Sequence, residues 1–85
     1  MSTFEDWALL KSTNQRYGPA FTRVESLAVE CFTGDCEGDT IVSLRGALRT
    51  LPETRETRAI LGMEDCQLRL WATAIALAII PSNRP

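Results

Sequence analysis

Residues 68–80 read LRLWATAIALAII, and every residue in this stretch except Arg69 and Thr73 is apolar. A helix with one wet face repeats its apolar residues at i, i+3, i+4 and i+7, whereas this segment is apolar around nearly its whole circumference. We therefore predict a helix over residues 64–80 that other parts of the chain cover on most sides. Its large residues form two ridges with alanines between them: Leu68, Trp71, Ile75 and Ile79 in one, and Leu70, Leu77 and Ile80 in the other.

An apolar run of this kind could also cross a membrane, and its length decides against that. At about 1.5 Å per residue, residues 68–80 extend roughly 20 Å, whereas the hydrocarbon core of a bilayer is about 30 Å thick. Arg69 lies inside the run, and Pro81 ends it. We therefore expect a helix of the protein core or of an interface, and no membrane role.

Four further helices are predicted before this one, because amphipathic stretches alternate with turn residues. Ser2 and Glu5 have the spacing of a capping box, as do Thr50 and Glu53, and Asp39 is placed to cap the helix that follows it. The predicted ranges are 3–16, 19–33, 40–50 and 51–61. The expected fold is a single all-α domain over residues 1–85, a compact array of about five short helices around a buried, apolar C-terminal helix.

Size and charge limit the functions that this chain can have. An 85-residue chain buries only a modest core, and such domains often gain stability by association, so a homodimer is one expected form. Nine Lys and Arg residues against eleven Asp and Glu residues give a net charge of −2. This balance argues against a broad nucleic-acid footprint, although a local basic patch stays compatible with it.

The cysteines and the first residues indicate a compartment. Cys31, Cys36 and Cys66 are an odd number of thiols, and MSTFEDWALL has neither a basic start nor a long apolar run. We expect a cytoplasmic, reducing environment. A disulfide between Cys31 and Cys36 would need a secreted setting, which nothing else in the sequence supports.

The sequence lacks the motifs that are typical of catalytic sites and metal-binding sites. The loop GDCEGD, residues 34–39, has too few oxygen ligands for an EF-hand calcium site, and the chain has no histidine to complete a zinc site. There is no glycine-rich phosphate loop, no nucleophile elbow and no Cys-x-x-Cys pair. We therefore expect no enzymatic activity, no cofactor and no metal.

Binding to another protein is the function that the sequence favours. An adaptor, a small chaperone or an inhibitor, such as a phage, viral or bacterial accessory protein, would use the apolar surface of the last helix. The predicted anchors are Trp71, Ile75 and Ile79, with Trp7 and Tyr17 on the first helix as a second set. For each of them the alternative is a place in the core, because large aromatic residues of small domains are usually buried.

Nucleic-acid binding is the second hypothesis. Two helices joined at Pro52 could present a row of arginines on one edge, and a dimer would double that edge. The predicted edge consists of Arg45, Arg49, Arg55 and Arg58. Glu53 and Glu56 lie among these arginines and can pair with them locally, which weakens the hypothesis.

One short segment resembles a known repeat family. Residues 76–85, ALAIIPSNRP, resemble the close of a tetratricopeptide repeat, in which an alanine–leucine pair, an apolar turn, a proline and an asparagine recur. The resemblance covers these ten residues alone and carries over no binding residue. It implies helical hairpins that hold a helix or an extended peptide of a partner.

Overall fold

The computed structural model describes residues 3–34, 36 and 38–80, and these residues form helices and turns without a strand. The elements are α1 (Thr3–Thr13), the 3₁₀ turn η1 (Gln15–Tyr17), α2 (Gly18–Thr33), α3 (Asp39–Leu48), α4 (Arg55–Leu61) and α5 (Asp65–Ile79). The predicted all-α class and the compact array of five helices are confirmed.

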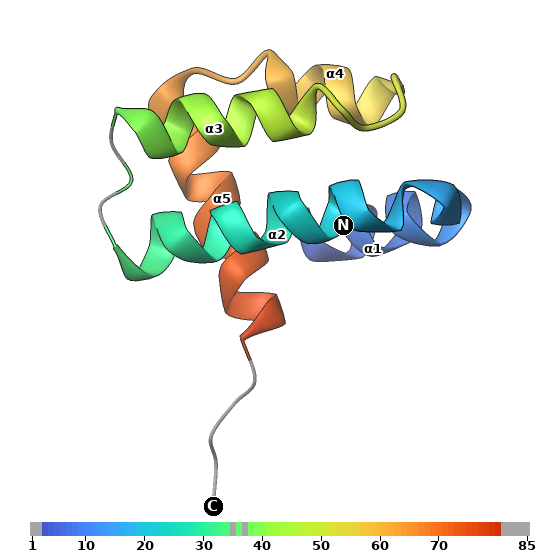
Figure 1. Ribbon diagram of the computed structural model, residues 1–85, viewed down its shortest axis with the longest axis horizontal. Helices are drawn as coiled ribbons and strands as arrows, with labels where there is room; N and C mark the ends of the chain where they lie inside the picture. Colours follow the sequence, from blue (N-terminus) through green and yellow to red (C-terminus); the bar gives the residue numbers. More distant parts are fainter. Residues whose placement is uncertain (1–2, 35, 37, 81–85) are drawn as a thin grey trace, which may run out of the picture.

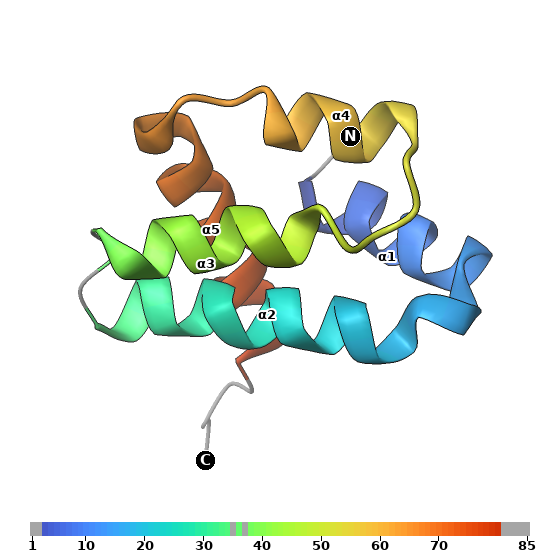
Figure 2. The ribbon, with the colours of Figure 1, turned by 45° about the horizontal axis from the view of Figure 1, so that its top comes forward.

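The helices form two layers that are joined by α5 (Figure 1). Helices α3 and α4 lie in one layer, α1 and α2 lie in the other, and α5 runs across both. Helix α5 packs mainly on α2 and also on α1, and α2 packs on α3. Figure 2 shows the same arrangement from a second side, with α3 lying along α2 and α4 above α1. Because α5 touches helices far from it in the sequence, it ties the two ends of the described chain together.

An aromatic cluster lies at the centre of the core. The Trp7 ring meets Phe21 edge to face at 5.2 Å and Trp71 edge to face at 5.3 Å between ring centroids. This geometry is the favoured one for aromatic pairs. Nε1 of Trp7 donates a hydrogen bond of 2.8 Å to Glu25 Oε2, so the indole N–H does not go unpaired. The cluster therefore joins α1, α2 and α5.

Helix α5 is covered on one face only. Its buried residues are Leu68, Trp71, Ala72, Ile75 and Ala76. Leu70 and Leu77, by contrast, are 71% and 61% exposed. The prediction that this helix is covered on most sides is not confirmed, because within the described chain its neighbours pack against a single side of it.

The first helix is shorter than predicted, because polar side chains take up its last carbonyls. Nδ2 of Asn14 donates to the carbonyl oxygen of Leu10 at 2.9 Å, and the hydroxyl of Ser12 donates to that of Leu9 at 2.9 Å. Side chains that bond the local backbone in this way compete with helix continuation. The chain consequently leaves the α-helix after Thr13 and makes the 3₁₀ turn.

The predicted caps are also corrected. Helix α3 has Gly38 at its N-cap, with φ of 47°, and Asp39 is the first helical residue instead of the cap. Glycine suits that position because a left-handed φ costs it little. The capping-box spacing at Ser2 and Glu5 includes residue 2, which lies outside the described residues.

Helix α4 starts at Arg55, not at residue 51, and its capping box uses two threonines. Thr57 N–H donates to Thr54 Oγ1 at 3.1 Å, and Thr54 N–H donates to Thr57 Oγ1 at 2.8 Å. The expected box at Thr50 and Glu53 is wrong, because Leu51 is drawn into the core and the chain stays non-helical until Thr54.

Replacing Thr57 with valine should lower the free energy of unfolding by about 1–3 kcal/mol, the usual cost of leaving buried polar groups unpaired. Thr57 is buried, and its hydroxyl also lies 3.0 Å from the carbonyl oxygen of Pro52, to which it donates. Valine keeps the shape and removes both bonds. Urea unfolding would measure the loss, with the exposed Thr22→Val as the control. Equal losses in the two variants would contradict a role for the capping box.

Candidate protein-binding surfaces

Three of the five predicted protein-binding anchors lie in the core. Trp71 and Trp7 form the aromatic cluster and are only 6% and 2% exposed, and Ile75 is fully buried, so none of them projects from the surface as an anchor. Ile79 is partly buried against the core. Tyr17 is exposed at the end of the 3₁₀ turn. Large apolar side chains serve equally well as core and as interface anchors, so their identity did not separate the two roles.

An exposed apolar face runs along α5 on the side away from the core. Leu70 and Leu77 are seven residues, or about two helical turns, apart and therefore lie on the same side of the helix. Ala74 lies between them, and Cys66 lies one turn before Leu70 and is exposed. We call Cys66, Leu70, Ala74 and Leu77 the outer face of α5. None of these four residues is charged.

A groove lies between α1 and α4. It has a volume of about 190 Å³, and its lining includes Trp7 and Trp71 at the floor, Asp6 on the α1 side, and Glu56 and Ala59 on the α4 side. A second hollow of about 260 Å³ shares Asp6, Leu10 and Glu56 with the first and continues between α1 and the start of α4. We call the two together the α1–α4 groove.

The charged residues that line the α1–α4 groove are acidic. Asp6 and Glu56 line both hollows, and no Lys or Arg is among the described residues that line either. Within the described part of the chain the ion pairs join Lys11 to Glu25 and Arg45 to Asp65. The two carboxylates of the groove are therefore not neutralised by a described cation.

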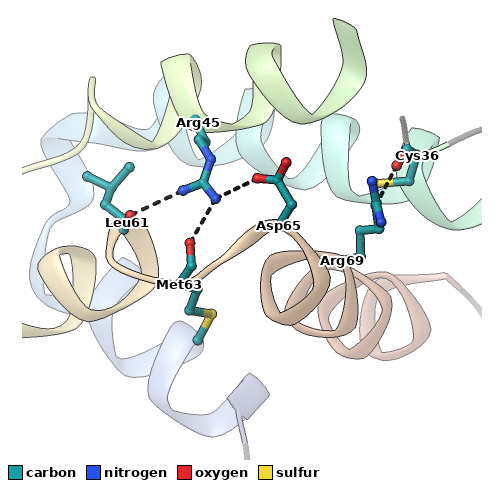
Figure 3. Close-up of polar contacts among 6 residues, drawn as sticks. All are labelled: Cys36, Arg45, Leu61, Met63, Asp65 and Arg69. Atoms are coloured by element: carbon teal, nitrogen blue, oxygen red, sulfur yellow. Dashed lines mark hydrogen bonds and ion pairs between the residues drawn. The ribbon is translucent and has the colours of Figure 1, made fainter. Parts of the chain in front are cut away.

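Arg45 of the predicted nucleic-acid edge is used inside the fold (Figure 3). Its Nη1 donates to the carbonyl oxygen of Leu61 at 3.1 Å, and its Nη2 donates to that of Met63 at 2.7 Å and to Asp65 Oδ1 at 2.8 Å. The side chain is only 20% exposed. Arg45 thus holds the turn between α4 and α5 instead of facing a ligand.

The other three predicted arginines are exposed. Arg49 and Arg58 line one hollow together with Glu53, and Arg55 lies at the start of α4. Arg69, which was not among the predicted residues, directs its Nε to the carbonyl oxygen of Cys36 at 2.7 Å (Figure 3). The edge that the structure presents is therefore smaller than predicted, and it includes an acidic residue.

The cysteines differ from the prediction. Cys31 and Cys36 are paired in a disulfide, with their Cα atoms 4.2 Å apart, whereas Cys66 is an exposed thiol. Cys31 lies in the last turn of α2, and Cys36 lies three residues beyond the end of that helix. The expectation that all three cysteines are thiols is wrong for this structure, and the pairing gives no support to a reducing compartment.

The remaining findings are negative. Across residues 3–34, 36 and 38–80, His, Cys, Asp and Glu side chains do not gather in threes where they could hold a metal ion. None of the helices in that part of the chain has the length and hydropathy needed to span a bilayer.

No protein-family model, curated protein or solved structure matches the chain, so its sequence and its structure carry the functional argument alone.

Proposed function

We propose that this chain is a non-enzymatic helical module that binds another protein, as an adaptor, a small chaperone or an inhibitor does. The observation that carries the proposal is the outer face of α5, on which Leu70 and Leu77 are 71% and 61% exposed. Full burial of one leucine side chain is worth about 1.5–3 kcal/mol. The two leucines together would supply a substantial part of the binding free energy of a micromolar complex, which is roughly 8 kcal/mol.

The outer face fits an apolar helix of a partner. Leu70 and Leu77 project from the same face of α5, and the small Ala74 between them leaves room for a close approach of a second helix. A partner helix would bury both leucines without having to neutralise a charge. A second copy of this chain is one such partner, and a phage, viral or bacterial accessory role in the cytoplasm belongs to the same proposal.

Nucleic-acid binding ranks second. With Arg45 occupied by the turn between α4 and α5, the edge consists of Arg49, Arg55 and Arg58. Each phosphate contact contributes roughly 0.9 to the slope of log affinity against log salt, so three contacts give weak binding at physiological salt. A dimer that doubled the edge would be needed for stronger binding.

The double variant Leu70→Asp/Leu77→Asp tests the proposed function. We expect it to lose affinity for the partner by at least about tenfold, because two central apolar contacts are replaced by charges. Circular dichroism and the melting temperature should stay unchanged, since both leucines face away from the core. The readout is affinity purification from the producing cells, quantified by mass spectrometry.

The matched control is Val42→Asp on α3, because Val42 is 68% exposed and lies outside the outer face. Proteins recovered with the parent chain and with Val42→Asp, but not with the double variant, would support the proposal. Light scattering of all three proteins tells a second copy from a different partner. Recovery of the same proteins with the parent chain and with both variants would contradict the proposal. Binding to a nucleic-acid duplex would also contradict it, if Arg49→Glu/Arg58→Glu abolished that binding and the leucine variant retained it.

A further inference from the structure

We propose that the α1–α4 groove is a second docking site, and that it takes a basic segment of a partner protein with one large apolar side chain. The groove is built from α1, α4 and the inner side of α5, so it is separate from the outer face of that helix. The two sites are independent, and the groove can be occupied whether or not the outer face binds.

The volume of the hollow over Trp7 and Trp71, one of the two hollows of the groove, selects the side chain that it holds. Sites for drug-sized molecules usually have about 300–1,000 Å³, whereas the hollow over Trp7 and Trp71 has about 190 Å³. This volume suits one apolar side chain, such as a leucine, a methionine or a phenylalanine. A peptide segment would place such a side chain in this hollow and its main chain along the adjoining hollow of about 260 Å³.

The floor of the groove is already in place before any ligand arrives. Trp7 is held by its hydrogen bond to Glu25 and by edge-to-face contact with Trp71. Glu25 in turn accepts a bond of 2.7 Å from Lys11 Nζ, which fixes the carboxylate. A rigid floor spares the entropy cost of ordering side chains on binding.

The two carboxylates that line the groove, Asp6 and Glu56, favour a basic segment. Asp6 comes from α1 and Glu56 from α4, so the two carboxylates approach the groove from different helices where its two hollows meet. A Lys or Arg of the ligand placed there would meet two negative charges that the described chain does not neutralise. Exposed ion pairs each add only about 0.2–1 kcal/mol, so the charges act mainly on specificity and association rate.

The path of the groove sets how the segment lies. One hollow sits over the tryptophans, and the other extends along α1 toward Leu9 and Thr13. An extended segment would place its apolar side chain over Trp7 and Trp71 and a basic residue between Asp6 and Glu56. The remaining residues would then follow α1.

The experiment selects a displayed library of random 12-residue peptides on the immobilised full chain. Enriched peptides should pair a large apolar residue with Lys or Arg. A synthetic peptide of the most enriched sequence is then titrated by tryptophan fluorescence, because both tryptophans of the chain line the groove. We expect Ala59→Leu, which fills the groove, to weaken binding by about tenfold or more, the effect of losing one buried apolar contact.

The charge variant Asp6→Asn/Glu56→Gln should weaken the peptide about fivefold at low salt and remove most of the salt dependence. Two controls should bind the peptide as the parent does: Ala8→Leu, an exposed alanine of α1 outside the groove, and Leu70→Asp/Leu77→Asp on the outer face. Melting temperatures confirm that every variant is folded.

Several results would overturn the docking site. These are the absence of enriched peptides, the enrichment of acidic peptides, and a peptide whose affinity is unaffected by both Ala59→Leu and the charge variant. A peptide lost only with Leu70→Asp/Leu77→Asp would assign the binding to the outer face. The proposed function would then stand and the groove would not.

Discussion

Trp71→Ala is expected to lower the free energy of unfolding by about 3–5 kcal/mol, which is the usual cost of truncating a buried tryptophan. The side chain is only 6% exposed, and it meets Trp7 edge to face at 5.3 Å. Small domains have a total stability of about 5–15 kcal/mol, so the variant should be partly or wholly unfolded at 37 °C. Urea unfolding followed by circular dichroism measures the change.

The neighbouring residue supplies the control. Leu70→Ala removes an equally apolar side chain from the same helix, but Leu70 is 71% exposed, so we expect a change within about 0.5 kcal/mol. A Trp71→Ala variant that melts like the parent chain would contradict the core position of this tryptophan. It would return Trp71 to the role of a surface anchor, which the sequence also allows.

Arg45→Ala is expected to cost about 2–4 kcal/mol, because it removes a charged donor that satisfies two carbonyls and one carboxylate. The turn between α4 and α5 would lose the contact that fixes where α5 begins. Arg45→Lys should recover little of the loss. The single ammonium group of lysine cannot reproduce the two separated Nη positions.

The matched control for Arg45 is Arg49→Ala. Arg49 lies one turn further along the chain, is exposed, and has no ion pair with any residue of the described ranges. Thermal unfolding by calorimetry compares the variants, and hydrogen exchange at the amide of Leu68 reports on the start of α5. Equal melting temperatures for Arg45→Ala and Arg49→Ala would contradict the structural role of Arg45.

The sequence predicted where the helices lie better than it predicted which residues cover them. Apolar spacing along residues 19–33, together with Pro19 as a residue suited to a first helical turn, placed the start of α2 within one residue of the observed Gly18. The first helix and α4 were placed less well. Their true ends depend on hydrogen bonds of Asn14 and Thr54, which compete with other plausible caps.

The outer face of α5 shows what periodicity cannot supply. Both ridges of that helix are apolar, and the side that α2 and α1 cover decides which residues become core. Trp71 therefore became core and Leu70 stayed exposed, although both lie on apolar ridges and the sequence allowed Trp71 to be either an anchor or a core residue.

Contacts between residues that are distant in the sequence could not be predicted from it either. The α1–α4 groove joins Asp6 to Glu56, and Arg45 binds main-chain carbonyls that no sequence pattern marks. Each of these features requires the relative positions of whole helices.

The place of α5 across both layers bears on how the chain matures during synthesis. A ribosome releases α1 to α4 first, and the apolar faces of α1 and α2 stay open until the residues of α5 emerge. The Trp7–Trp71 contact in particular cannot form before then. The core is therefore completed only once α5 has left the ribosome, and until then the apolar side chains of α1 and α2 that pack on α5 are uncovered and prone to aggregation.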